Sequence, residues 1–146
     1  MYSARSTLAP AQRGFTLIEV MVVVVIIGLL AAIVAPNLIG NIDKAAVTRA
    51  RGDIRSIETA LNLYRLDNFR YPTSDQGIEA LVANPGESTA PSWKPYLKGV
   101  PSDPWSQPYQ YSYPGQQGEF DVFSYGADGQ EGGEDINADI GNWDFY

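Results

Sequence analysis

The chain has 146 residues, with ten lysines and arginines, 17 aspartates and glutamates, and neither cysteine nor histidine. The missing residue types exclude disulfides, Cys/His zinc sites, cysteine nucleophiles and catalytic histidines. The net charge of −7 is concentrated near the end, because Glu119–Asp144 holds eight carboxylates and no cation. A basic surface for nucleic acid is therefore absent from that part.

A continuous apolar segment follows a short polar N-terminus. Phe15–Ala35 is 21 residues long and carries one charge, Glu19. As a helix it spans roughly 31 Å, close to the ~30 Å hydrocarbon core of a bilayer. Arg5 and Arg13 precede it, and no acid does. The positive-inside bias therefore predicts a cytoplasmic N-terminus and an outward-facing remainder, in the periplasm of a two-membrane bacterium.

Two plainer interpretations of this segment are a secretory signal peptide and a simple anchor. The apolar run is longer than the roughly 7–15 residues of a signal peptide, and no small-x-small cleavage site follows it. A simple anchor has no use for Glu19, because an unpaired carboxylate in hydrocarbon costs several kcal/mol. The residue instead favours a helix whose neighbour supplies a positive charge.

The next region, from Leu38 to about Asp67, has the pattern of an amphipathic helix. Together with the anchor it forms a predicted helix of about 50 residues, kinked by Pro36, with Asn68 as a left-handed cap. One apolar stripe at helical spacing is expected to pack against the domain that follows. This stripe comprises Val47, Ala50, Ile54, Ile57, Leu61 and Tyr64.

The remainder predicts a small globular head of mixed structure. Thr73–Gln76 has the pattern of a capping box that opens a second helix, from about Ser74 to Val82. Asn84–Pro104 is rich in Pro, Ser and Gly and is expected to be mainly loop. Gln110–Tyr113 and Glu119–Tyr125 predict an antiparallel hairpin with a loop longer than two residues, covered on one side by the long helix.

The segment from Tyr125 to Asp139 combines glycines with acidic side chains. Glycines let the backbone turn its carbonyls inward, and Ca²⁺ binds about 6–8 carboxylate and carbonyl oxygens. Asp135-x-Asn137-x-Asp139 has the opening spacing of an EF-hand, but the glycine and glutamate that complete that motif are absent. A solvated acidic loop is the alternative. The lack of disulfides and the mutual repulsion of clustered acids favour a bound cation.

Several motifs resemble those of a known family. The run GFTLIEVMVVVVIIG resembles the class III signal of the type IV pilin-like superfamily. YRLDNFRYP, the segment around Asp103-Pro104-Trp105, and GADGQEGG with ADIGNWD resemble the major pseudopilins of type II secretion systems. Ser106 stands where that family commonly has glycine.

The resemblance implies a pilin-like α+β fold and four segments: a leader (1–14), a transmembrane and assembly helix (15–37), an amphipathic helix (38–67) and a periplasmic head (68–146). It also implies cleavage between Gly14 and Phe15, N-methylation of Phe15, and pairing of Glu19 with a neighbour's amine. A calcium site in the C-terminal loop is implied as well. Its ligands are the side chains of Asp128 and Asp135 and the backbone oxygens of Tyr125 and Gln130, with Gly133 and Asp139 as further candidates.

The implied function is structural rather than enzymatic. Subunits of this family polymerise into a periplasmic pseudopilus that drives folded proteins through the outer membrane. Implied partners are other copies of the chain, minor pseudopilins, the prepilin peptidase, the inner-membrane assembly platform and the outer-membrane secretin. One alternative is a type IV pilin for adhesion or motility, although such pilins commonly carry a cysteine pair. The other is a membrane-tethered periplasmic enzyme, for which a head of this size offers little room for a substrate pocket.

Overall fold

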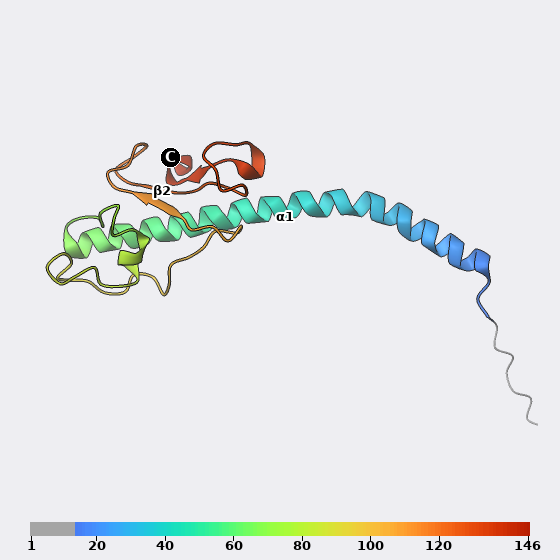
Figure 1. The fold of residues 1–146 in the computed structure, drawn as a ribbon, viewed down its shortest axis with the longest axis horizontal. Coiled ribbons are helices and arrows are strands. Elements are labelled where there is room, and N and C mark those ends of the chain that lie inside the picture. Colours follow the sequence, from blue (N-terminus) through green and yellow to red (C-terminus); the bar gives the residue numbers. More distant parts are fainter. Residues whose placement is uncertain (1–13) are drawn as a thin grey trace, which may run out of the picture. The chain divides into compact units, whose positions relative to one another are not determined.

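The computed structural model describes residues 14–146, except for the side chains of residues 35–39 (Figure 1). The predicted leader thus lies almost wholly outside the described residues. The chain divides into two compact units, Met1–Ile39 (unit 1) and Gly40–Tyr146 (unit 2). The elements are a helix α1 (Leu17–Asn68), strands β1 (Gln110–Ser112), β2 (Asp121–Ser124) and β3 (Ile140–Gly141), and 3₁₀-helices η1 (Ile78–Leu81), η2 (Asp135–Asn137) and η3 (Asn142–Phe145). The α+β class is confirmed.

Helix α1 has 52 residues and includes Pro36, in agreement with the continuous helix predicted from the sequence. Within unit 1, every side chain from Phe15 to Val34 is exposed in the single chain. Leu17–Val34 is long and apolar enough to cross a membrane, judged by length and composition. A helix that is apolar on all sides must bury its surface in lipid or against other proteins.

In unit 2, one face of α1 forms the centre of the hydrophobic core. Ile54, Ile57, Leu61 and Tyr64 are fully buried, and Val47 packs at the edge of the same cluster. The predicted stripe is therefore confirmed. Apolar residues from the rest of unit 2 complete this core, namely Tyr71, Ile78, Leu81, Tyr109, Phe120, Val122 and Ile140.

The C-terminal end of α1 differs from the prediction. Phe69, not Asn68, adopts the left-handed conformation, with a φ of 62°. Asn68 stays helical, and its buried side chain is held by three hydrogen bonds. Its amide donates to the Tyr64 carbonyl and to the Tyr96 hydroxyl, and its Oδ1 accepts from the Ser92 backbone N–H.

The predicted second α-helix is wrong, although its capping box forms. The Thr73 N–H donates to Gln76 Oε1 at 2.9 Å, and the Gln76 N–H donates to Thr73 Oγ1 at 3.3 Å. Gly77 then takes a φ of 61°, which ends the turn, and only the short 3₁₀-helix η1 follows. η1 still buries Ile78 and Leu81, as the sequence predicts for these two residues.

The three strands form one antiparallel sheet in the order β1-β2-β3. Tyr111 pairs with Val122, and Phe123 pairs with Gly141. The predicted hairpin is confirmed, whereas β3 has only two residues and was not predicted. Figure 1 shows β2 alongside α1. The Tyr109 hydroxyl donates to Asp53 on α1 at 3.0 Å, and burial, followed by this carboxylate, raises the pKa of Tyr109.

Buried polar side chains fix the loops around this sheet. Asp121 is 3% exposed and accepts backbone N–H bonds from residues 116–118, which closes the loop between β1 and β2. Asn142 lies beside β2 and replaces a strand partner: its Oδ1 accepts from Val122 N–H, and its amide donates to Phe120 O. These bonds compensate the cost of burying polar groups.

We expect Ile57→Ala or Leu61→Ala to lower the free energy of unfolding of unit 2 by about 2–5 kcal/mol, because each change leaves a cavity in the core. Urea unfolding of the full chain in mild detergent, followed by tryptophan fluorescence, measures this, since all three tryptophans lie in unit 2. Leu66→Ala is the matched control, because Leu66 lies on α1 but is 71% exposed. Equal losses in all three variants would contradict the assignment of the core.

Candidate functional site

The start of α1 contains a reciprocal capping arrangement between Thr16 and Glu19. The backbone N–H and the hydroxyl of Thr16 both donate to Glu19 Oε2, each at 3.0 Å. In return, the Glu19 N–H donates to Thr16 Oγ1 at 3.3 Å. This is the capping box of a T-x-x-E sequence, which satisfies backbone donors that have no partner within the helix.

The capping box gives Glu19 a role within its own chain that was not predicted from the sequence. The sequence pattern of this box, Thr16-x-x-Glu19, could have indicated it. The bonds satisfy one carboxylate oxygen but leave the charge uncompensated, because no cation forms an ion pair with Glu19 among the described residues. Phe15, immediately before the box, is 87% exposed. The predicted processing residues Gly14 and Phe15 and the predicted assembly residue Glu19 thus all lie within residues 14–19, and all three are exposed.

The second candidate site is the C-terminal loop, Tyr125–Asp139. The loop is closed by the Ala127 N–H, which donates to Ile136 O at 2.9 Å. Gly126 has a φ of 73°, and a Cβ atom there would lie 2.8 Å from the Ile136 carbonyl oxygen. Gly133 has a φ of 92° and would likewise collide with Asn137. Glycine is required at both positions because φ is positive there and because residues 136–138 of the same loop lie close to the backbone.

The entrance to this loop is held by a buried carboxylate. Asp103 is 3% exposed and accepts N–H bonds from Trp105 and Gln107 at 3.0 and 2.7 Å. It also accepts from the Ser124 hydroxyl at 2.5 Å, and Ser124 Oγ accepts from the Gly126 N–H. The sequence offered Asp103 only as part of a family motif, and the structure shows that it supports the loop.

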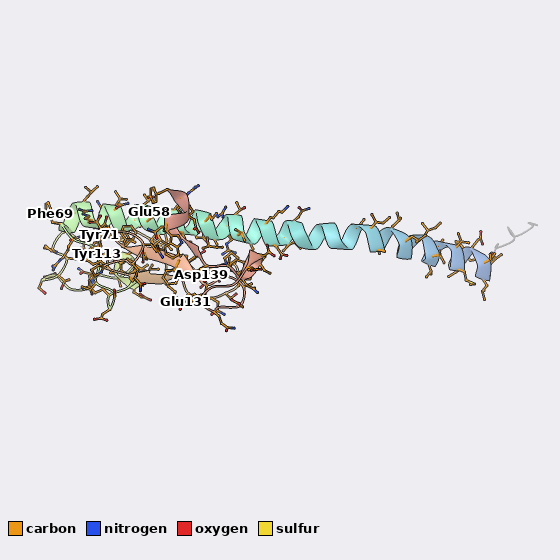
Figure 2. All side chains as sticks on the ribbon, turned by 90° about the horizontal axis from the view of Figure 1, so that it is seen from above. Glu58, Phe69, Tyr71, Tyr113, Glu131 and Asp139 are labelled. Carbon is orange, nitrogen blue, oxygen red and sulfur yellow. The ribbon has the colours of Figure 1, made fainter. Side chains whose placement is uncertain are left out.

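The acidic side chains of the loop differ in their hydrogen bonding and in their exposure to solvent. Asp128 accepts from the Gln130 N–H at 3.1 Å, and Asp139 Oδ2 accepts from the Gly132 N–H at 3.0 Å. The other oxygen of Asp139 is buried and has no hydrogen-bond partner in the part of the chain that the structure describes. Asp135 is exposed and has a φ of 55°, and Glu131 is exposed as well. Figure 2 shows Glu131 and Asp139 on the same side of unit 2.

The loop does not gather a metal site from side chains alone. Among the described residues, no group of three or more His, Cys, Asp or Glu side chains is placed to hold a metal ion. Backbone oxygens are available, because the carbonyls of Tyr125, Gln130 and Gly133 accept no hydrogen bond from the described part of the chain. The loop therefore offers three backbone carbonyls and the carboxylates of Asp128 and Asp139. Each of these carboxylates accepts one backbone hydrogen bond, and the second oxygen of Asp139 is buried without a partner among the described residues.

Comparison with known families identifies the chain. The model of the family described as "Type II secretion system (T2SS), protein G" matches residues 37–143. The chain belongs to this family. A second model, described as the prokaryotic N-terminal methylation motif, matches residues 10–35, which include Gly14, Phe15 and Glu19.

Similar proteins of known family agree with this assignment. The type II secretion system core protein G of Pseudomonas aeruginosa is 57% identical over 91% of this chain and 96% of its own. The protein of the same description from Vibrio cholerae is 56% identical over 90% of this chain and 92% of its own. The crystal structure of the major pseudopilin of enterohaemorrhagic Escherichia coli superposes with a TM-score of 0.64. It is 43% identical and covers 75% of this chain and 96% of its own.

Family membership decides several of the sequence predictions. The chain is a major pseudopilin of a type II secretion system, a structural subunit of a self-polymerising family. The interpretation as a type IV pilin for adhesion or motility is set aside, because the matching family and the relatives belong to type II secretion. The expected N-methylation motif is present.

We expect Gly126→Ala to destabilise unit 2 by about 1–3 kcal/mol. Alanine is strained at the positive φ of this position, and its Cβ atom would collide with the backbone of residues 136–138. Thermal unfolding of the full chain in detergent measures this. Gly99→Ala is the control, since a Cβ atom at Gly99 meets nothing within 4 Å. If both variants melt like the wild type, the loop does not have the close approach described above.

Proposed function

We propose that this pseudopilin is cleaved between Gly14 and Phe15, is methylated on the new N-terminal Phe15, and polymerises into a periplasmic pseudopilus that drives folded proteins through the outer membrane. The observation that carries the proposal is the methylation motif at residues 10–35, which contains the exposed apolar segment Leu17–Val34 of α1. In the membrane this helix is solvated by lipid. In a fibre, the same surface is buried against other copies.

The proposal includes a topology and a set of partners. Arg5 and Arg13 favour a cytoplasmic N-terminus, with unit 2 in the periplasm. The prepilin peptidase acts on Gly14–Phe15, and the inner-membrane platform, the minor pseudopilins and the outer-membrane secretin are the partners in assembly and secretion. The chain itself performs no chemistry in this scheme.

Glu19 has two separable tasks in this proposal. Its carboxylate caps α1 through Thr16, and its charge attracts the free amine of Phe15 in a neighbouring subunit. Both charges are costly in hydrocarbon, so pairing them favours association of two copies. A cap needs only an oxygen that accepts hydrogen bonds, whereas the pairing needs the negative charge.

We therefore expect Glu19→Gln and Glu19→Ala both to insert and to be processed but to fail in fibre assembly and secretion. Glutamine keeps an oxygen for the cap and removes the charge, so it separates the two tasks. Secretion and fibre formation are measured in cells, and mass spectrometry of the mature N-terminus verifies that every variant begins at Phe15. Thr16→Ala is the control that weakens the cap and keeps the charge.

Normal assembly of Glu19→Gln together with loss in Thr16→Ala would reduce Glu19 to a capping residue. A wild-type chain that retains Met1 in the membrane would contradict the proposed processing itself.

We further propose that the C-terminal loop binds one Ca²⁺. The loop offers hard oxygens, and its glycines allow carbonyls to turn toward an ion. Support comes from the unpartnered buried oxygen of Asp139 and from the free carbonyls of Tyr125, Gln130 and Gly133. The proposed side-chain ligands are Asp128, Asp135 and Asp139. The structure favours Asp139 more strongly than the sequence does, because its orphaned oxygen carries a desolvation cost that a cation would remove.

Calcium binding is expected to stabilise unit 2, because an ion that binds only the folded state adds RT ln(1 + [Ca²⁺]/Kd), about 2.7 kcal/mol at 100 times Kd. The full chain in detergent should melt at a lower temperature in chelator and recover more with Ca²⁺ than with Mg²⁺, which prefers tighter octahedral sites. Asp128→Ala, Asp135→Ala and Asp139→Asn should each abolish this difference.

Glu87→Ala is the control for these variants, because Glu87 is exposed and lies outside the loop. It should retain the full response to Ca²⁺. Identical melting of the wild type with and without chelator would leave the segment as a solvated acidic loop.

A further inference from the structure

An apolar ridge is exposed at the C-terminal end of α1. It consists of Leu63, Leu66 and Phe69, which are 45%, 71% and 92% exposed. Figure 2 shows Phe69 at the far end of unit 2 from Asp139 and Glu131. The stripe that forms the core lies on a different face of the same helix. The ridge therefore contributes nothing to the core of its own chain.

Phe69 is an unusual residue for its backbone position. A φ of 62° at the end of a helix is normally taken by glycine or asparagine, because a side chain is strained there. Such strain is ordinarily offset by packing, but this phenyl ring is almost fully exposed. Nothing within the described chain accounts for an aromatic side chain at this point, and a surface outside the chain would.

Unit 2 also has an open groove at its opposite end. The groove has a volume of about 720 Å³, and much of its lining is apolar. It is formed by α1 and η2, with the lining residues Gly40, Asp43, Lys44, Val47, Thr48, Arg51, Asp135 and Ile136. Because an apolar cavity of about 150 Å³ holds benzene, this groove has room for a phenyl ring and a leucine side chain.

Arg70 beside the ridge and Asp43 in the groove carry opposite charges, whereas the groove as a whole is balanced, because Lys44 and Arg51 line it together with Asp43 and Asp135. Arg70 follows Phe69, and its guanidinium donates only to the carbonyls of Ser88 and Thr89. Among the described residues, Arg70 has no carboxylate partner, and Asp43 in the groove has no cation partner. The nearby Asp67 is already paired with Lys94 at 2.9 Å.

We infer that Leu66 and Phe69 of one copy dock in the α1–η2 groove of a second copy, with Arg70 of the first beside Asp43 of the second. The two surfaces lie at opposite ends of one unit, so the contact is head to tail. Such a contact does not close on itself and generates an open filament rather than a dimer. The inference rests on the assembly proposed above and assigns one of its interfaces.

Crosslinking tests the contact directly, because the chain contains no cysteine. Leu66→Cys keeps Phe69, and Thr48→Cys places a thiol on the exposed rim of the groove. With both changes in one full-length chain, a short bismaleimide applied to intact cells should give a ladder of trimers and larger species. Each single variant should give no species larger than a dimer.

The matched control is Leu66→Cys with Ser56→Cys, because Ser56 is also exposed on α1 but does not line the groove. It should give no ladder. Normal fibre formation by the Leu66→Cys/Thr48→Cys chain without a ladder overturns the docking and leaves the assembly proposal standing. A wild-type chain that forms no fibres at all overturns both.

A second test separates docking from folding. Phe69→Gly should weaken each contact roughly tenfold or more and reduce fibre yield, because it removes a large apolar side chain. It should not lower the melting temperature of the full chain, since glycine suits the left-handed backbone. Arg70→Asp should reduce fibre yield, and Asp43→Arg in the same chain should restore it. Normal fibre yield in Phe69→Gly, or no rescue of Arg70→Asp by Asp43→Arg, overturns the docking.

Discussion

Burial of one face of α1 is the constraint on which unit 2 depends. Ile54, Ile57, Leu61 and Tyr64 are completely covered, and the sheet, η1 and the aromatic loops all pack against them. The sheet has only short strands, one of them of two residues, and such a sheet is not stable without a partner. The helix supplies that partner. Because the same helix carries the exposed apolar segment of unit 1, one element serves both folding and assembly.

The second constraint is the satisfaction of buried polar groups without disulfides. Asp103, Asp121 and Asn142 are almost fully buried, and each collects hydrogen bonds that fix a loop. The C-terminal loop follows the same principle through Ser124 and Gly126, with one exception. Asp139 keeps a buried oxygen that has no hydrogen-bond partner among the described residues, and this is the observation that supports the cation proposed for the loop.

The exposed features of the molecule are explained by burial in a membrane or in an assembly. Outside a membrane, a single copy gains nothing from an apolar helix surface, a Glu19 charge without an ion-pair partner among the described residues, or a strained, solvent-facing Phe69. Each is costly in isolation, and in the proposed polymer a neighbouring copy relieves that cost. In the proposed polymer, the charge of Glu19, the apolar surface of α1 and the ridge at its C-terminal end each form a different contact between copies.

The sequence by itself determined the long helix, its buried stripe, the hairpin and the family, because helical and strand periodicity and the motif around Glu19 are local patterns. It did not determine β3, whose two residues carry no pattern of their own and pair only because the loop returns them to β2. It predicted a left-handed conformation at Asn68. In the structure, hydrogen bonds to Ser92 and Tyr96 hold the Asn68 side chain, and Phe69 takes the left-handed conformation instead. It predicted a second α-helix from about Ser74 to Val82, whereas the positive φ of Gly77 leaves only a turn and the short 3₁₀-helix η1. The orphaned oxygen of Asp139 and the groove beneath η2 were decided by tertiary structure alone, because both arise where segments distant in the chain are packed together.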